Sequence, residues 1–218
     1  MSIQQLPSRT DYIGSLKNLA AYINVAELKP YQPELTKRGD PKVYSGGFAI
    51  TCPIRHPNTQ KRRALRMFVV LTPDLEQRYQ AISEFITQHM NTGIFAEAKY
   101  LTRGITVSGT LYPICYMDWV EGVTLDAYIR SNIGDLSKIA PLADAFMHMI
   151  DNMRSINAAH GDLSAENIMA LPDGSMVLID YDGMYVPKLA GYLPCVAGQF
   201  NFQHPQRFTR AYSGYFGA

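Results

Sequence analysis

The spacing of the apolar residues changes near residue 121, and this change constrains the fold more than any other feature of the sequence. Between residues 43 and 120 apolar and polar positions alternate in short runs, which is typical of strands with one buried face. After residue 122 apolar residues recur every three or four positions, the period of an amphipathic helix. A strand-rich half followed by a helix-rich half predicts an α+β protein.

The first half of the chain predicts five strands and one helix. Three antiparallel strands are expected in "KVYSGGFAITCPI" and "RRALRMFVVL", where the double glycine and the turn signal "HPNTQ" separate the strands. A helix is expected over residues 73–90, because Leu75, Tyr79, Ile82 and Ile86 follow one another at helical spacing. Two further strands, "FAEAKYLTRGI" and "TLYPICYMDWV", complete this half.

The second half predicts helices followed by a hairpin. Thr124 is a suitable N-cap for a helix over residues 125–133, and a longer helix is expected over 139–157. The apolar runs "NIMAL" and "MVLI" lie on either side of "PDG", a turn sequence that predicts a β-hairpin. Residues 1–40 carry three prolines and weak periodicity, which suits a short helix and an extended lead-in.

Composition excludes several classes of protein. The 218 residues are 47% hydrophobic, enough for a globular core, and the formal net charge of +1 gives no general attraction to nucleic acid or anionic lipid. The apolar runs are far shorter than the roughly 20 residues that cross a bilayer. The three cysteines show no metal-ligand spacing. We therefore expect a cytoplasmic protein without a membrane or nucleic-acid partner.

The segment "HGDLSAENIMALPDGSMVLIDYD" carries the residues that point to chemistry. Asp162 and Asn167 precede the first strand of the expected hairpin, and Asp180 follows the second strand directly. A carboxylate at Asp162 can orient and accept the proton of an attacking hydroxyl group. The oxygens of Asn167 and Asp180 are ligands of the kind that Mg²⁺ prefers beside nucleotide phosphates.

This order of residues resembles the protein-kinase-like superfamily, in which H-R-D-x-x-x-x-N is followed by D-F-G. The resemblance extends from about Val43 to about Arg207. It implies a bilobal fold, whose N-lobe is an antiparallel sheet plus one helix (called αC in the family) and whose C-lobe is helical. The corresponding division is an N-terminal extension at 1–40, an N-lobe at 41–121 and a partial C-lobe at 122–218.

The resemblance also implies ATP and Mg²⁺ as cofactors and assigns residues to the nucleotide. The glycine-rich loop would run from Ser45 to Ala49, and Asp118–Val120 would form the hinge beside the gatekeeper Met117. The ionic partner of the β-strand cation would be Glu84 or Glu76 on the helix. The nucleotide-binding residues implied in this way are Ser45, Gly46, Gly47, Phe48, Ala64, Arg66, Glu84, Met117, Asp118 and Val120.

Several positions depart from the family pattern. Arg66 replaces the strand lysine, which keeps the charge but not the compact ammonium group. Gly161 replaces the arginine that reads a phosphorylated activation loop, and Ser164 replaces the lysine usual in Ser/Thr kinases. Asp182 stands in place of the D-F-G glycine, either as a third acidic group or as a turn residue. His160 is interpreted as a structural residue of the catalytic loop.

The C-terminal part is short for a kinase. "LPCVAGQFNFQHPQ" looks like the end of an activation segment, and only about a dozen residues follow it. The long helix over 139–157 has an apolar face that must be buried. The chain is therefore expected to be a fragment, a minimal kinase, or part of an oligomer or assembly whose partner covers this helix.

Three functions are compatible with these residues. The first is an ATP- and magnesium-dependent phosphotransferase, a Ser/Thr protein kinase with a protein substrate. The second is a pseudokinase or nucleotide-binding scaffold, indicated by Arg66 and the sparse glycines of the loop. The third is a small-molecule kinase of the aminoglycoside or choline type, indicated by "HGD" and Ser164. We rank them in this order, because Asp162, Asn167 and Asp180 are all present.

Overall fold

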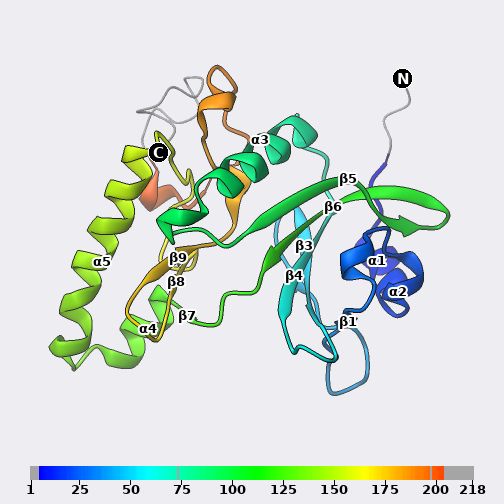
Figure 1. Cartoon of the computed structure of the whole chain (residues 1–218), viewed down its shortest axis with the longest axis horizontal. Helices are drawn as coiled ribbons and strands as arrows, with labels where there is room; N and C mark the ends of the chain where they lie inside the picture. The colour runs from blue at the N-terminus through cyan, green and yellow to red at the C-terminus, as the bar shows by residue number, and fades with distance from the viewer. Residues whose placement is uncertain (1–4, 73, 197, 204–218) are drawn as a thin grey trace. The chain divides into compact units, whose positions relative to one another are not determined.

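The chain is a mixed α+β protein, as the change of hydrophobic period predicts. The computed structural model describes residues 5–72, 74–196 and 198–203 (Figure 1). It divides the chain into two compact units, one formed by residues 1–77 and 98–119 and the other by residues 78–97 and 120–218.

The first unit is built on a six-stranded antiparallel sheet. Its strands have the order β1-β3-β4-β6-β5. Strands β1 and β2 both pair with β3, β1 near its C-terminal end and β2 near its N-terminal end. The long strands lie where alternation predicts them, whereas the two-residue β1 comes from the segment expected to be an extended lead-in. The strands are β1 (Gln32–Pro33), β2 (Tyr44–Ser45), β3 (Ala49–Arg55), β4 (Arg62–Phe68), β5 (Ala98–Val107) and β6 (Thr110–Asp118).

The pairing register divides this sheet into two faces, since residues directly opposite each other point to the same side. Leu65 and Met67 of β4 belong to the hydrophobic core, together with Ile50, Cys52 and Ile54 of β3. Ala64 and Arg66 alternate with them and therefore lie on the other face. Their partners in β6 are Met117 and Cys115, respectively.

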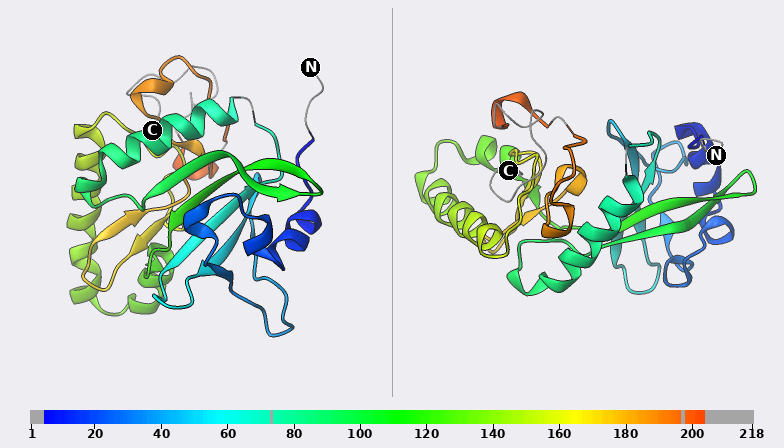
Figure 2. Two further views of the ribbon diagram at one scale, coloured as in Figure 1. Left: turned by 45° about the vertical axis from the view of Figure 1, so that its right-hand side comes forward. Right: turned by 90° about the horizontal axis from the view of Figure 1, so that it is seen from above.

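The N-terminal residues form part of the first unit. Helix α1 (Arg9–Leu16) begins with a capping box, in which the backbone amide of Asp11 donates to Ser8 Oγ at 3.3 Å and the Asp11 carboxylate accepts from the backbone amide of Ser8 at 2.9 Å. Helix α2 (Leu19–Tyr22) follows, and Figure 2 shows both helices beside the strands of this unit.

Side chains from α1 and α2 fill the core of the sheet. Tyr12 and Leu16 are fully buried there, and the Tyr12 hydroxyl donates to the backbone carbonyl of Phe68 at 3.0 Å. A 3-10 turn, Ala26–Leu28, adds the buried Leu28. The segment that sequence analysis sets apart as an N-terminal extension thus supplies one side of the hydrophobic core.

The second unit contains the helix α3 beyond its first turn, the helices α4 and α5, and a small sheet. Helix α3 (Leu75–Gln88) lies within the expected range. Thr124 caps α4 (Leu125–Asn132) as predicted, by accepting a hydrogen bond from the Ala127 amide at 3.3 Å. Helix α5 (Leu136–Ser155) begins three residues before the expected start, because Asp135 accepts from the Ser137 amide at 3.1 Å and caps that turn.

The predicted hairpin is the centre of the small sheet, whose strand order is β7-β8-β9. Its strands are β7 (Val123–Thr124), β8 (Ile168–Ala170) and β9 (Met176–Leu178), visible in Figure 1 near α4. Asp173 accepts from the Ser175 amide at 2.9 Å, and Gly174 takes the positive φ of +85° that the turn requires. Among the described residues, no helix is both long and apolar enough to cross a membrane.

Candidate functional site

The loop that precedes β8 brings Asp162 and Asn167 together. The Asn167 side-chain nitrogen donates to the backbone carbonyl of Asp162 at 2.8 Å and to Asp162 Oδ2 at 3.1 Å. This use of the amide nitrogen orients the side chain and leaves the amide oxygen as a potential ligand. The loop closes through a further bond, from the Asn167 backbone amide to the Ser164 carbonyl at 3.0 Å.

Asp180 lies at the other end of the hairpin, beside Asn167. The backbone amide of Ile179 donates to the Asn167 carbonyl at 3.0 Å, so Asp180 is one residue away from this contact. Its backbone has a φ of 63°, in the left-handed region that few residues other than glycine adopt. A non-glycine residue held in this conformation is typical of a segment whose surroundings determine its geometry.

His160 supports both ends of this arrangement. It is 2% exposed, and one of its ring nitrogens, Nε2, lies 2.9 Å from the Ile179 carbonyl. Burial lowers the pKa of His160, against the opposing effects of the Ile179 carbonyl and of the nearby carboxylates of Asp180 and Asp162. The neutral ring can donate from Nε2, which ties the loop to the strand end. This contact agrees with the structural role expected for His160.

Tyr181, the residue that follows Asp180, is anchored by its hydroxyl group, and it was not among the residues predicted from the sequence. Its ring is 3% exposed, and its hydroxyl donates to the Leu178 carbonyl at 2.7 Å while accepting from the Ala96 amide at 2.9 Å. A phenylalanine, as in the D-F-G motif, cannot make these bonds. The tyrosine at this place in the motif is the only sequence signal that could have indicated them.

Asp182 lies in the 3-10 turn Tyr181–Gly183 and is hydrogen-bonded to a helix. Its carboxylate accepts from the hydroxyl of Tyr79 on α3, and its backbone carbonyl lies 3.6 Å from the Cys195 sulfur. Both contacts are structural. They favour the interpretation of Asp182 as a turn residue over its interpretation as a third metal ligand.

Asp162 is also contacted by the segment Gly198–Gln203. The backbone amide of Gln199 donates to Asp162 Oδ1 at 3.0 Å, and the Gln199 side chain donates to Glu166 at 3.2 Å. Gly198 has a φ of +66°, and a Cβ there would come within 2.7 Å of Asp162 Oδ1. Both carboxylate oxygens of Asp162 therefore accept hydrogen bonds from the chain itself. The remainder of the expected activation segment, from residue 204, lies outside the described residues.

The residues that the resemblance assigns to the nucleotide lie mostly in the first unit. Ser45 ends β2, and residues 46–48 form the turn to β3, which is closed by a bond from the Gly46 amide to the Ala49 carbonyl at 2.9 Å. Arg9 of α1 donates to the Gly46 carbonyl at 3.1 Å. Of the expected hinge residues, Val120 belongs to the second unit. Asp118 belongs to the first unit and forms an ion pair with Arg63, with a nitrogen-to-oxygen distance of 2.9 Å.

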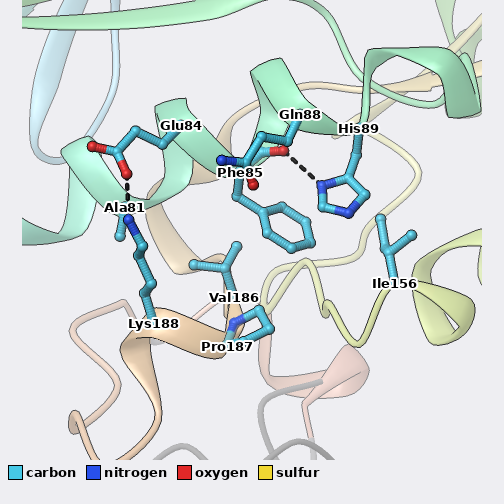
Figure 3. A pocket seen from close by; sticks show the side chains of 9 residues that line it. All are labelled: Ala81, Glu84, Phe85, Gln88, His89, Ile156, Val186, Pro187 and Lys188. Atoms are coloured by element: carbon cyan, nitrogen blue, oxygen red, sulfur yellow. Dashed lines mark hydrogen bonds and ion pairs between the residues drawn. The ribbon is translucent and has the colours of Figure 1, made fainter.

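The two candidate helix glutamates differ in their surroundings. Glu76 is in the first turn of α3. Glu84 lies later in the same helix and forms an ion pair with Lys188, and both of these residues belong to the second unit. Figure 3 shows this pair at one end of a cavity of about 300 Å³. Phe85 lies along the cavity and stacks on His89, with ring centroids 4.1 Å apart. Glu84 and Arg66 belong to different units.

The donor set of the hairpin is suited to magnesium. One amide oxygen and one carboxylate, from Asn167 and Asp180, are hard ligands that Mg²⁺ combines with phosphate oxygens and water. Within the described ranges, no group of three or more His, Cys, Asp or Glu side chains is placed to hold a metal by protein ligands alone. The residues thus fit a magnesium ion that arrives with a nucleotide.

No protein-family model and no curated protein sequence matches the chain.

Proposed function

We propose that the protein is an ATP- and magnesium-dependent phosphotransferase of the protein-kinase type, with a Ser or Thr side chain of a protein as acceptor. The observation that carries the proposal is the pair Asp162–Asn167, joined by a hydrogen bond at one end of a hairpin that carries Asp180 at its other end. A general base beside two oxygen ligands is the constellation that phosphoryl transfer needs.

Each residue has a separate role in this proposal. Asp162 orients the acceptor hydroxyl and takes its proton as the oxygen attacks the γ-phosphorus and the bond to the ADP leaving group breaks. Asn167 and Asp180 hold the divalent ion, which neutralises the charge of the phosphates when bound. His160 and Tyr181 keep the two ends of the hairpin in register.

The test is transfer from labelled ATP to a general protein substrate or to the chain itself. Asp162→Asn is expected to lower the transfer rate at least about hundredfold, the usual contribution of a positioned base, while ADP binding is kept. Asp180→Asn is expected to weaken the magnesium-dependent binding of ATP itself. Asp144→Asn, on the exposed side of α5, is the matched control and should behave as the wild type.

Two outcomes would contradict the proposal. One is a folded wild-type chain that transfers no phosphate to protein. The other is full activity in both site variants. If phosphate is transferred to aminoglycosides, choline or sugars but not to protein, the acceptor is a small molecule and not a protein side chain. The protein would then be the small-molecule kinase indicated by Gly161 and Ser164.

A nucleotide-binding scaffold is the second candidate, and the contact of Gln199 with Asp162 favours it. An acceptor hydroxyl must displace the Gln199 amide before it can reach Asp162 Oδ1. A scaffold would bind ATP without turning it over. ATP at 100 times its dissociation constant would then raise the free energy of unfolding by about 2.7 kcal/mol with no transfer, and Gly198→Ala, which displaces Gln199, would not restore activity.

A further inference from the structure

The cavity shown in Figure 3 lies along one face of α3, and its residues take no part in the proposed phosphate transfer. All of them belong to the second unit. The helix lines the cavity with residues spaced three or four positions apart, which share one face of a helix. These residues are Ala81, Glu84, Phe85 and Gln88, and the segment opposite them contributes Val186, Pro187 and Lys188.

Near its start, α3 is bonded to the same stretch of chain that forms the opposite wall. The Arg78 guanidinium donates to the Leu193 carbonyl, and the Tyr79 hydroxyl donates to the Asp182 carboxylate. Farther along the helix, the cavity of about 300 Å³ lies between the two. This volume corresponds to about ten water molecules and is at the lower end of the range of small-molecule sites. The cavity therefore suits a small ligand.

The middle of the cavity is apolar. Val186 is fully buried, and the half-buried ring of Phe85 lies along the cavity (Figure 3). His89 holds this ring in place, since it stacks on Phe85 and its Nδ1 donates to the Phe85 carbonyl at 2.8 Å. Ile156 adds a further apolar side chain to the lining. A fixed aromatic ring among aliphatic side chains favours an apolar group of the ligand.

The ion pair of Glu84 with Lys188 stands at one end of this apolar slot (Figure 3). The side chains of Glu84 and Lys188 are 56% and 67% exposed, so water screens the pair and it opens at little cost. A purely anionic ligand would lie beside Glu84, and a purely cationic ligand would lie beside Lys188. A ligand that carries one charge of each sign pairs with both groups and leaves no charge unpaired.

We propose that this cavity binds a free apolar amino acid, such as phenylalanine or leucine. The ammonium group of the ligand pairs with Glu84, its carboxylate pairs with Lys188, and its side chain lies against Phe85 and Val186. Residues within a peptide are not ligands of this site, because they lack both charges, and a residue at a chain end lacks one of the two. The proposal does not depend on the proposed function, since no nucleotide takes part in it.

The apolar slot and the ion pair make separate contributions to the affinity. Burial of the ligand's side chain should make phenylalanine and leucine bind about ten- to hundredfold more tightly than glycine. Loss of one charge-assisted contact should weaken binding by a similar factor, about ten- to hundredfold. For so small a ligand we expect a dissociation constant on the order of 0.1–1 mM, which calorimetry can measure.

The test is a calorimetric titration of phenylalanine, leucine and glycine into the full chain, without nucleotide or magnesium. Glu84→Gln and Lys188→Met each remove one charge and should raise the dissociation constant of phenylalanine about ten- to hundredfold. Lys138→Met is the matched control, because it removes the exposed partner of Asp135 on α5 and should bind phenylalanine as the wild type does. Thermal unfolding of each variant shows that the chain is folded before binding is compared.

Two analogues of phenylalanine show whether each charge recognises its own part of the ligand. 3-Phenylpropanoate lacks the ammonium group, so it should bind the wild type more weakly than phenylalanine does, but bind Glu84→Gln within about threefold of phenylalanine. Phenethylamine lacks the carboxylate and makes the same comparison with Lys188→Met. A merely structural ion pair would not match each variant to one analogue. In hydrogen exchange, the Leu189 amide, which donates to the Val186 carbonyl at 2.8 Å, should exchange more slowly when phenylalanine is bound.

Several outcomes would overturn the amino-acid site. One is the absence of saturable heat with phenylalanine up to about 10 mM, roughly tenfold above the weakest constant expected. Others are wild-type affinity in both Glu84→Gln and Lys188→Met, an equal loss in Lys138→Met, or glycine that binds as tightly as phenylalanine. None of these results bears on phosphate transfer, which is measured with ATP and without amino acids, so the two proposals fail separately.

Discussion

The core of the first unit and the segment 158–183 of the second unit are held together by different forces. In the first unit, apolar side chains of four strands and two N-terminal helices pack into one buried cluster. In the segment 158–183, polar side chains are held one by one, through the bonds of His160 to Ile179, Asn167 to Asp162 and Tyr181 to Leu178.

This difference follows from the nature of the two kinds of interaction. Burial of apolar surface is strong but has no direction, so it stabilises a scaffold without placing individual atoms. Hydrogen bonds add less free energy, yet their geometry sets where oxygen atoms lie. The first unit should therefore respond to changes of side-chain volume, and the segment 158–183 to the loss of single polar atoms.

The largest effect is expected in the core. Leu16→Ala removes a fully buried side chain of α1 and should lower the free energy of unfolding by about 2–5 kcal/mol. Trp119 emission during urea unfolding measures it, since this residue lies in the same unit. Leu16→Met should cost less than about 1.5 kcal/mol, and Leu35→Ala, at an exposed position, almost nothing. Equal stability of Leu16→Ala and the wild type would show that the N-terminal helices are not part of this core.

A smaller effect is expected at Tyr181. Tyr181→Phe keeps the ring but removes the hydroxyl, which leaves the buried Ala96 amide without its acceptor, at a cost of about 1–3 kcal/mol. Hydrogen exchange of that amide should speed up about tenfold, and phosphate transfer should fall with it. Tyr128→Phe, at a partly exposed tyrosine of α4, is the control. Unchanged protection of Ala96 in Tyr181→Phe would mean that shape, not the hydroxyl, holds this segment.

The smallest effect is a dependence on pH through His160. Burial lowers the pKa of this histidine below its ordinary value of about 6.5, so below that pH the unfolded chain binds a proton that the folded chain does not. Its contribution to stability is therefore complete above about pH 6.5 and is lost as the pH falls, by up to about 1.4 kcal/mol per pH unit.

The measurement is the free energy of unfolding between pH 5 and 7.5, in the wild type and in His160→Gln. The glutamine keeps a donor for the Ile179 carbonyl but cannot titrate, so its curve should be flatter in this range. Parallel curves for the two proteins would show that other groups cause the dependence.

Much of the fold could be predicted because it depends on local patterns. The alternation in "FAITCPI" and "RRALRMF" predicts β3 and β4, and the turn chemistry of "PDG" predicts the hairpin β8–β9. The place of Asp162 and Asn167 in one loop before the hairpin could be predicted for the same reason, since they are five residues apart. The start of α5 was misplaced, because the apolar spacing from which it was predicted does not show the N-cap Asp135.

Contacts between distant residues could not be predicted in this way. The pairing of Glu84 with Lys188 joins residues 104 positions apart, and the contact of Gln199 with Asp162 joins residues 37 positions apart. Tyr12 reaches Phe68 over 56 positions. The periodicity of a segment shows which of its faces is buried, but it does not show against which other segment that face packs.

The sequence alone determined the order of strands and helices, the hairpin and the loop spacing of Asp162 and Asn167, because these follow from backbone preferences and hydrophobic period within a few residues. The tertiary structure decided that the N-terminal helices complete a core, that a tyrosine hydroxyl ties Asp180 to a distant backbone, and that Glu84 meets Lys188 beside a cavity. These contacts arise only when remote segments bury surface together, since the free energy that selects them belongs to the packed pair and to neither segment by itself.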